Sequence, residues 1–483
     1  MGLPEKVLSD SFFSSVRVII SALRGIIIIP IITNFLGADS YGTWTTIIAF
    51  VGLVTSSGGL HLHGSLIRFS QDEDMAEVYS DTLALSILIG LATAVSVTVL
   101  GLNTDVVSLL QLDSVDKVLV IIMISFVIFF NMIFEISSNF PRALGEIRLY
   151  DTILILKMTV ETVGLIWVFS TGLSIFYGLI VIITVSAIAN FTLFVVYNYY
   201  FSLPVPRMKR FRRYISYGLP MVPKEISSSL LANGDKYIIL YFLSPTAVGI
   251  YAVARSVSVS ITNFTKILNP TLYPTVSNAF DKGNIEQLSN LYENVMRFYI
   301  VFSLPTFFGI IFLSYPIALV ISNNRIAMSA EVLIPVLTIG FLFRGFDDTL
   351  SYILTADQQT KIIGKITTIA VLVNIVLNLL FIQEIGLMGA AIATLASHVI
   401  ISTLIYIKSY QVVEFAYPYR SFIRCLASSI IMFITLHILL DDFSAQLLIL
   451  VAPLMGSVLY FTSLFVLGEF DLKIMKQLIP VDL

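Results

Sequence analysis

Long apolar runs constrain this chain more than any other feature of its sequence. Ile19–Phe35 is one such run, and similar runs recur throughout the 483 residues. Hydrophobic residues make up 57% of the chain and charged residues 12%, with a mean hydropathy of +0.92. A soluble domain is about 45–50% apolar and about 25% charged. No soluble core can bury this much apolar surface, so lipid must surround much of it.

The length of the runs distinguishes helices from a transmembrane barrel. A barrel would show short segments of alternating polarity, whereas these runs are long enough for helices. We therefore predict an all-α polytopic membrane protein with about 14 transmembrane helices, joined by connections too short to form a domain. The expected spans are 11–35, 43–67, 81–101, 117–139, 150–170, 173–201, 215–241, 246–275, 297–322, 331–356, 362–383, 386–407, 421–440 and 445–467.

The basic residues outside the spans predict the orientation. With a cytoplasmic N-terminus, the outer connections hold only Lys117 and Arg325. Cytoplasmic loops carry the excess of Lys and Arg, so we predict a multi-pass protein of the cell membrane with both termini in the cytoplasm. The N-terminal run is expected to be the first helix and not a cleaved signal peptide. The basic residues expected on the cytoplasmic side are Lys6, Arg68, Arg142, Arg148, Arg207, Lys209, Arg210, Arg212, Arg213, Lys282, Arg297, Lys361, Lys365, Lys408, Arg420, Arg424, Lys473 and Lys476.

Short sequence matches indicate an internal repeat. Phe35-Leu36 precedes Tyr41-Gly42, and Phe242-Leu243 precedes Val248-Gly249 at the same spacing. Gly178 and Gly389 give a weaker match at a similar offset. Parallel repeats are a transporter architecture. We predict an N-lobe at 1–203 with helices 1–6, a basic cytoplasmic linker at 204–213, a C-lobe at 214–410 with helices 7–12, and helices 13–14 with a cytoplasmic tail at 411–483.

Basic residues inside the predicted spans are the candidate functional residues. A charge near the bilayer centre costs about 2.5–3.5 kcal/mol on insertion scales, so these side chains should face protein or a wet cavity. At a rise of about 1.5 Å per residue, Arg24, Arg255 and Arg344 lie roughly 15–20 Å into their helices. The eight basic residues within the predicted spans are Arg17, Arg24, Lys157, Lys224, Lys236, Arg255, Lys266 and Arg344.

Arginine suits an anionic headgroup because its planar fork holds phosphate and stays charged when desolvated. We predict a cationic cavity in which Arg24, Arg255 and Arg344, with Arg17 and Lys266, bind a phosphate or pyrophosphate headgroup. Arg17 shares one face of the first helix with Arg24. Arg17 and Lys266 are also near the inner interface, where they could simply extend their charge to water.

Acidic residues near these cations form a second candidate group. We predict that Asp235, Lys236, Asp347 and Asp348 take part in ion coupling or pairing. Asp235 could pair with Arg255, either as a structural ion pair or as part of the site. Asp235 or Asp347 could instead bind a coupling cation, H+ or Na+, or release an arginine when protonated.

Catalytic signatures are absent from the sequence. It contains no P-loop, HExxH, GxSxG or CxxC pattern, so we expect no enzyme activity, no catalytic residue, no cofactor and no metal site. His61 and His63 are two residues apart and would point in different directions on a helix, so a metal pair is not expected. The near-neutral net charge of −3 gives no reason to expect a nucleic-acid partner.

Four ordered motifs resemble those of a known family. They are Leu36–Gly42 (LGADSYG), Tyr217–Pro220 (YGLP) followed by Gly234-Asp235-Lys236, Val248–Tyr251 (VGIY), and Gly386–Ala391 (GLMGAA). Their order and spacing over helices 1–12 are similar to the polysaccharide biosynthesis proteins, which are flippases of the multidrug/oligosaccharidyl-lipid/polysaccharide exporter (MOP) superfamily. Each motif alone has little specificity, whereas the set together is fairly specific.

The resemblance implies a fold and a function. Members of that family flip lipid-linked oligosaccharides on undecaprenyl or dolichyl carriers from the cytoplasmic leaflet outward. They have two six-helix lobes, a central cationic cavity and often two further helices that guide the lipid tail. The implied partners are a polyprenyl- or dolichyl-linked glycan, membrane lipid, a coupling cation and glycan-assembly proteins. The alternatives are a multidrug/cation antiporter of the same superfamily and, less favoured, a membrane glycan polymerase or ligase.

Overall fold

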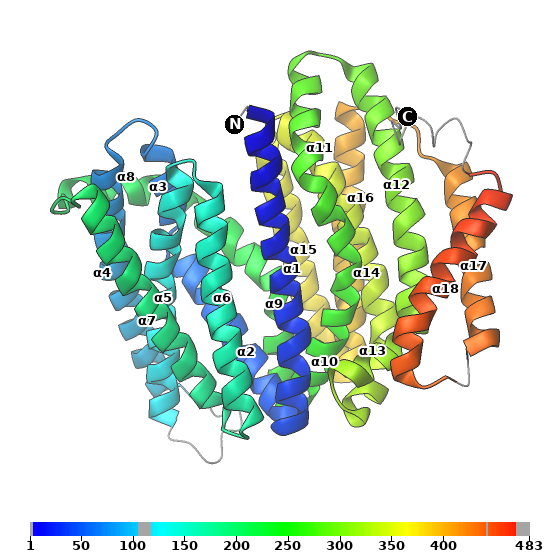
Figure 1. Ribbon diagram of the computed structural model, residues 1–483, viewed down its shortest axis with the longest axis horizontal. Coiled ribbons are helices and arrows are strands. Elements are labelled where there is room, and N and C mark those ends of the chain that lie inside the picture. Colours follow the sequence, from blue (N-terminus) through cyan, green and yellow to red (C-terminus); the bar gives the residue numbers. More distant parts are fainter. Residues whose placement is uncertain (1–2, 105–116, 441–442, 470–483) are drawn as a thin grey trace. The chain divides into compact units, whose positions relative to one another are not determined.

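The computed structural model describes residues 3–104, 117–440 and 443–469, without the side chains of 3–12, 264, 266–271 and 273–274. All regular elements within this part of the chain are helices (Figure 1), which confirms the all-α prediction. The contacts between residues divide the chain into two compact units, Met1–Ala252 and Val253–Leu483, called here unit 1 and unit 2. The predicted lobe boundaries rest on the sequence repeat and stay a prediction.

Unit 1 is built from nine helices and the first part of a tenth. Helix α1 packs along α6, and α5 packs against α4 and α7. Helix α9 packs against α2. The helices are α1 (Leu3–Phe35), α2 (Gly37–Gly58), α3 (Leu62–Phe69), α4 (Met75–Asn103), α5 (Lys117–Ala143), α6 (Ile147–Ser170), α7 (Ile175–Phe201), α8 (Phe211–Gly218), α9 (Val222–Phe242) and α10 (Pro245–Ser258), with short 3-10 turns at Met208–Arg210 and Leu219–Met221.

Unit 2 contains the end of α10 and the remaining helices. Helix α14 packs against α16, and α16 packs against α15. The last two helices, α17 and α18, lie side by side (Figure 1) and contact α12. The helices are α11 (Asn263–Asp281), α12 (Ile285–Phe312), α13 (Ser314–Ile321), α14 (Asn324–Ala356), α15 (Thr360–Ile385), α16 (Leu387–Val412), α17 (Tyr419–Leu440) and α18 (Ala445–Val466), with a 3-10 turn at Val259–Thr262.

The number of membrane spans is compatible with the sequence prediction. Among the described residues, 11 helices are long and apolar enough to cross a membrane, or 12 when α2 and α3 are taken as one span bent by 44°. The predicted span 215–241 corresponds mainly to α9, which is more polar than the 11 helices that could cross a membrane. The predicted span 246–275 corresponds to α10 and α11 with the 3-10 turn between them.

Two glycines from the predicted repeat meet each other inside unit 1. A Cβ built on Gly42 of α2 would lie 1.8 Å from the carbonyl oxygen of Pro245 at the start of α10. A Cβ built on Gly249 of α10 would lie 2.5 Å from the carbonyl oxygen of Ala38 in α2. The backbones touch because neither residue carries a side chain. This explains why the LGADSYG and VGIY motifs each need a glycine.

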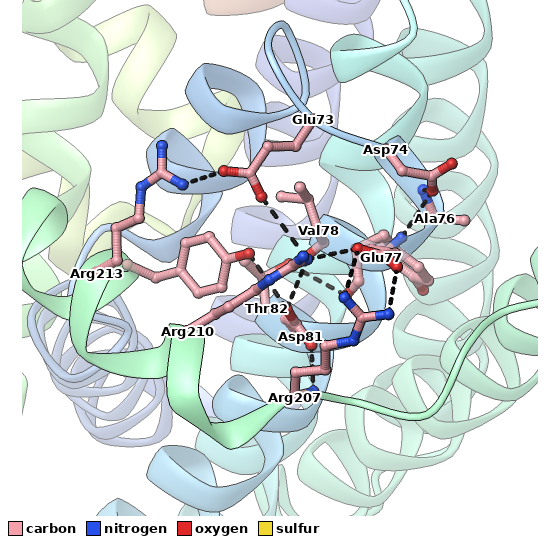
Figure 2. Close-up of polar contacts among 12 residues, drawn as sticks. Glu73, Asp74, Ala76, Glu77, Val78, Asp81, Thr82, Arg207, Arg210 and Arg213 are labelled. Atoms are coloured by element: carbon pink, nitrogen blue, oxygen red, sulfur yellow. Dashed lines mark hydrogen bonds and ion pairs between the residues drawn. The ribbon is translucent and has the colours of Figure 1, made fainter.

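Within unit 1, basic residues before and in the first turn of α8 pair with acidic residues of α4 and of the loop before α4. Figure 2 shows Arg207, Arg210 and Arg213 facing Glu73, Glu77 and Asp81. Arg210 Nη1 lies 2.7 Å from Glu77 Oε2, and Arg213 pairs with Glu73. The hydrogen bond to Glu77 raises the pKa of Arg210.

Asp81 is the buried centre of this contact. Its side chain is 2% exposed, and its Oδ1 accepts the backbone N–H of Arg207 at 2.6 Å. The Tyr214 hydroxyl donates to Asp81 Oδ2 at 3.3 Å. Burial, with help from the Asp81 carboxylate, raises the pKa of Tyr214 to about 12, so this hydroxyl keeps the proton that it donates. The sequence assigns these arginines to the orientation and to a basic linker, and the structure adds their specific pairing with acidic residues of α4 and the loop before it.

We predict that Gly42→Ala destabilises the protein because the new methyl group would overlap backbone atoms of Pro245. Overpacking of this kind costs about 1–3 kcal/mol or more. The matched control is Gly52→Ala in the same helix, where a Cβ would meet nothing within 4 Å. Thermal unfolding of the purified protein in detergent measures both changes. Equal unfolding temperatures for the two variants would refute the close crossing of α2 and α10.

Candidate functional site

A polar cavity of about 560 Å³ lies within unit 1. It opens between α1, α2, α3, α5, α6 and α7, and both charged and amide side chains line it. Glu135 and Arg142 of α5 stand on one face with Asn131 and Ser138, at spacings of three and four residues. The polar lining is completed by Arg24, Thr55, Ser56, His63, Asn139, Tyr150, Lys157 and Glu161.

Arg24 of α1 lines this cavity and pairs with Glu161 of α6. Its Nη1 donates to Glu161 Oε2 of α6 at 3.1 Å. Lys157 Nζ donates to Glu161 Oε1 at 2.6 Å, as the four-residue spacing of Lys157 and Glu161 leads one to expect. The Glu161 side chain is 6% exposed and that of Arg24 is 27% exposed. Two cations therefore share one buried carboxylate, and one positive charge is left over at the cavity wall.

Arg17 does not line the cavity and pairs with a buried carboxylate of α6. Its Nε lies 2.6 Å from Asp151 Oδ1 of α6. Ser14 Oγ donates to the other oxygen, Asp151 Oδ2, at 2.6 Å. The Asp151 side chain is 1% exposed. The Arg17–Asp151 pair joins α1 to α6, which is a structural role that the sequence reading did not include.

Arg255 lies at the end of α10, in unit 2. Its guanidinium carbon is 4.9 Å from the centre of the Phe341 ring. Arg255 Nη1 is buried and has no hydrogen-bond partner among the described residues. His398 also contacts Phe341, with its ring centre 5.4 Å from that of Phe341. Neither ring nitrogen of His398 has a hydrogen-bond partner in the described part of the chain, although its side chain is almost fully buried.

The candidate residues on α14, Arg344, Asp347 and Asp348, include both buried and exposed groups. Arg344 Nε lies 4.0 Å from Asp348 Oδ2, and their side chains are 34% and 41% exposed. Asp347 is buried, and its Oδ1 lacks a hydrogen-bond partner among the residues described. Arg344 therefore keeps most of its hydrogen-bonding capacity available.

Asp235, Lys236 and Lys266 complete the predicted set. Asp235 is buried in α9, and its Oδ2 accepts the Tyr251 hydroxyl at 2.7 Å. Lys236 is half-buried beside it in sequence. The proposed pairing of Asp235 with Arg255 would join the two units and stays a prediction. The side chain of Lys266 lies outside the described residues.

The sequence reading missed Glu135 and His63 as members of the cavity. His63 Nδ1 lies 2.7 Å from Glu135 Oε1. The signal that could have found this wall is the series Asn131, Glu135, Ser138 and Arg142 on an otherwise apolar helix, because its spacing places all four on one face.

Comparison with known proteins places the chain in a family. The model of the polysaccharide biosynthesis protein family matches residues 31–325, so the chain belongs to this family. One related protein comes from Haloferax volcanii and is described as a probable low-salt glycan biosynthesis flippase, Agl15. It is 28% identical to this chain over 233 residues. That match covers 48% of this chain and 49% of the relative, so the chain spans about half the length of the curated relatives it matches.

Solved structures show the fold more completely. The lipid II flippase MurJ in an inward closed conformation is similar over 94% of this chain and 97% of that chain, with a TM-score of 0.77 and 17% identity. An inward-facing multidrug resistance MATE transporter of the MOP superfamily is similar over 82% of this chain and 94% of that chain, with a TM-score of 0.65 and 15% identity. The resemblance to the polysaccharide biosynthesis proteins is confirmed, and the fold is similar to those of the two solved transporters.

We predict that Lys157 and Glu161 behave as one unit. Glu161→Leu alone leaves Arg24 and Lys157 without their carboxylate, whereas adding Lys157→Met removes one of the two stranded charges. The double variant should therefore be more stable than the sum of the single effects predicts, by about 0.5–3 kcal/mol. Thermal unfolding of the four proteins of this cycle measures the coupling. Additive effects would contradict the shared carboxylate.

Proposed function

We propose that this protein is a flippase for a lipid-linked oligosaccharide with a phosphate or pyrophosphate at the linkage. It carries this substrate from the cytoplasmic to the outer leaflet by alternating access, for the assembly of a surface polysaccharide or glycan. The observation that carries the proposal is the surplus cation on the Arg24–Glu161–Lys157 cluster at the wall of a polar cavity. Membership in the polysaccharide biosynthesis family supports it.

Unit 2 supplies further groups that suit an anionic headgroup. Arg255 has a buried Nη1 with no hydrogen-bond partner among the described residues, and Arg344 makes only a 4.0 Å contact with Asp348. Arginine forms charge-assisted bidentate bonds with phosphate oxygens. In the proposed mechanism Arg24, Arg255 and Arg344 hold the linkage phosphates, with Arg17 and Lys266 closer to the inner interface. Buried polar groups left unsatisfied are costly, so a bound phosphate would stabilise this arrangement.

An apolar groove in unit 2 suits the lipid tail. It has a volume of about 390 Å³ and lies between α12, α13, α17 and α18. Its lining includes Phe302, Phe312, Leu436 and Phe461. The hydroxyl of Tyr460, a polar group in the lining, donates to the carbonyl oxygen of Val301 at 2.8 Å and is thus satisfied within the protein. An isoprenoid chain can occupy such a groove without leaving a polar group unpaired.

The alternative is a multidrug/cation antiporter, which the MATE-like fold also allows. A site for cationic drugs would favour acidic walls. The cavity of unit 1 carries Arg24, Arg142 and Lys157 against Glu135 and Glu161, so its fixed charges favour an anion. A membrane glycan polymerase or ligase ranks third, because no residues with a catalytic arrangement stand out in the described part of the chain.

The remaining parts of the proposal follow from the sequence. Both termini lie in the cytoplasm and the protein resides in the cell membrane, as the distribution of Lys and Arg indicates. Ion pairing, or coupling to H+ or Na+, involves Asp235, Lys236, Asp347 and Asp348. Glycan-assembly proteins and the polyprenyl- or dolichyl-linked glycan are the expected partners.

Replacement of Arg24 or Arg344 by Ala tests the headgroup role. A hydrogen bond to a charged group contributes about 1.5–3 kcal/mol, which corresponds to roughly a ten- to hundredfold loss of transport. Surface glycan is measured in cells that lack the native protein and express each variant. The control is Arg68→Ala, which removes an exposed pair with Asp72 outside the cavity. Normal glycan from both cavity variants, at normal protein levels, would exclude the proposed role of these residues.

Filling the apolar groove tests the lipid-tail role. A Cβ built on Gly309 meets nothing within 4 Å although Gly309 lines the groove, so Gly309→Trp should occupy the groove without disturbing the helices. Gly364→Trp on α15 is the control, because its Cβ position is equally open and it does not line the groove. We expect surface glycan to fall at least severalfold with Gly309→Trp only. Equal glycan levels in the two variants would argue against a tail in this groove.

A further inference from the structure

The break between α2 and α3 brings two histidines together. Leu60 and His61 have φ angles of 48° and 53°, in the left-handed region that side chains with a Cβ rarely adopt. The chain therefore leaves the helical path before His63, and the ring centres of His61 and His63 lie 4.3 Å apart. The sequence prediction that these two side chains point in different directions is wrong, because it assumed an uninterrupted helix.

Neighbouring glycines hold the break in place. A Cβ built on Gly64 would lie 2.3 Å from His61 Nε2, so only a glycine leaves room for the ring. A Cβ built on Gly218 of α8 would lie 2.0 Å from the carbonyl oxygen of Leu60. A backbone in a sparsely populated conformation persists where its surroundings determine it, and such positions concentrate at functional sites. The geometry of His61 is thus imposed by two separate elements of unit 1.

Each histidine faces a carboxylate from a different helix. His63 Nδ1 lies 2.7 Å from Glu135 Oε1 of α5, a hydrogen-bond distance. His61 Nδ1 lies 3.5 Å from Glu225 Oε1 in the first turn of α9, and this buried nitrogen makes no hydrogen bond with any described residue. The four side chains are 22–30% exposed, so water can reach them. The four side chains lead from α9 to the polar cavity in the order Glu225, His61, His63 and Glu135. The last two line the cavity.

The charges around the four side chains favour a proton as the ligand. Among the described residues, no group of three or more His, Cys, Asp or Glu side chains is arranged to hold a metal ion. Lys224 adjoins Glu225 on α9, and Arg24, Lys157, Arg142 and Glu161 line the same cavity as Glu135. Two imidazolium rings 4.3 Å apart repel each other, so protonation of one opposes protonation of the other.

We propose that His61, His63, Glu135 and Glu225 form a proton-binding site that controls the contact of the α2–α3 break with α9. The proposal rests on the proposed flippase function and deepens it, because it assigns H+ as the coupling ion and gives it a site in unit 1. Protonation of the neutral His61 ring, whose exposed part water can reach, gives both ring nitrogens an N–H, so the 3.5 Å approach of Nδ1 becomes a charge-assisted hydrogen bond with Glu225. Repulsion from His61 then drives the proton of the His63–Glu135 pair into the cavity. Loss of the proton from His61 breaks the bond to Glu225 and frees α9 at this point.

Histidine titrations in the full chain test this site directly. The chain has four histidines, which are His61, His63, His398 and His437, so selectively labelled protein in lipid nanodiscs gives few NMR signals to assign. We expect His61 and His63 to titrate as a coupled pair. His63→Gln should shift the titration midpoint of His61 upward by about one pH unit, because it removes a like charge. Glu225→Gln should shift the same midpoint downward, because it removes the partner of the protonated ring.

The control is His437→Gln in unit 2, where the His437 ring packs against Phe312 and Phe433 at 4.9 and 4.7 Å between ring centres. It should leave the midpoints of His61 and His63 unchanged. Unchanged His61 midpoints in both His63→Gln and Glu225→Gln would overturn the proposal. These titrations need no substrate, so they can succeed or fail independently of the flippase assignment.

Hydrogen–deuterium exchange tests control of the contact. Each exchange rate is divided by the intrinsic rate of the unstructured peptide at the same pH, which gives a protection factor. Below the His61 midpoint, we expect higher protection factors in residues 59–63 and 222–226 of the unaltered protein, and no such change in Glu225→Gln. Protection factors in these segments that are the same above and below the midpoint in the unaltered protein would overturn the proposed control of α9.

Discussion

The cost of charge in lipid governs how this protein is held together. Charged side chains within the apolar helices must find partners inside the protein, because lipid offers none. Two buried carboxylates are each shared by two basic side chains. Glu161 binds Arg24 and Lys157 and so joins α1 to α6. Glu469 binds Arg297 at 2.6 Å and Arg424 at 3.2 Å, which joins the segment after α18 to α12 and α17. Each cluster satisfies a buried acid and keeps a positive surplus, and the surplus of the Glu161 cluster lies at the wall of the unit 1 cavity.

The sequence predicted the fold because its strongest signals are local. Apolar runs and short motifs can each be recognised within a few residues, and they sufficed for the all-α class and the family. The partner of Arg24 could not be predicted in this way, since Glu161 lies on another helix and only packing brings the two together. The directions of the His61 and His63 side chains were predicted wrongly for a related reason. The break in the helix packs against Gly218, which lies far along the chain.

The candidate residues differ in how well they are satisfied. In unit 1, Arg17 and Arg24 both have carboxylate partners. In unit 2, Arg255, Asp347 and His398 each keep a buried polar atom without a hydrogen bond among the described residues. Unsatisfied groups of this kind are rare in stable interiors and are expected where a protein binds a ligand or changes its conformation. Unit 1 also keeps such an atom, His61 Nδ1, beside its paired arginines. Both units therefore hold polar groups that are able to change partners.

The crossing of Gly42 and Gly249 has a consequence for how the protein is made. The two glycines are far apart in sequence, yet their backbones must touch. At a synthesis rate of roughly 5–20 residues per second, α2 enters the membrane roughly 10–40 s before α10 emerges. During that time the exposed backbone surface at Gly42 has no native partner. The newly inserted N-terminal helices must therefore persist as an incomplete bundle, and this interval is where a quality-control protease or an insertion factor would find its substrate.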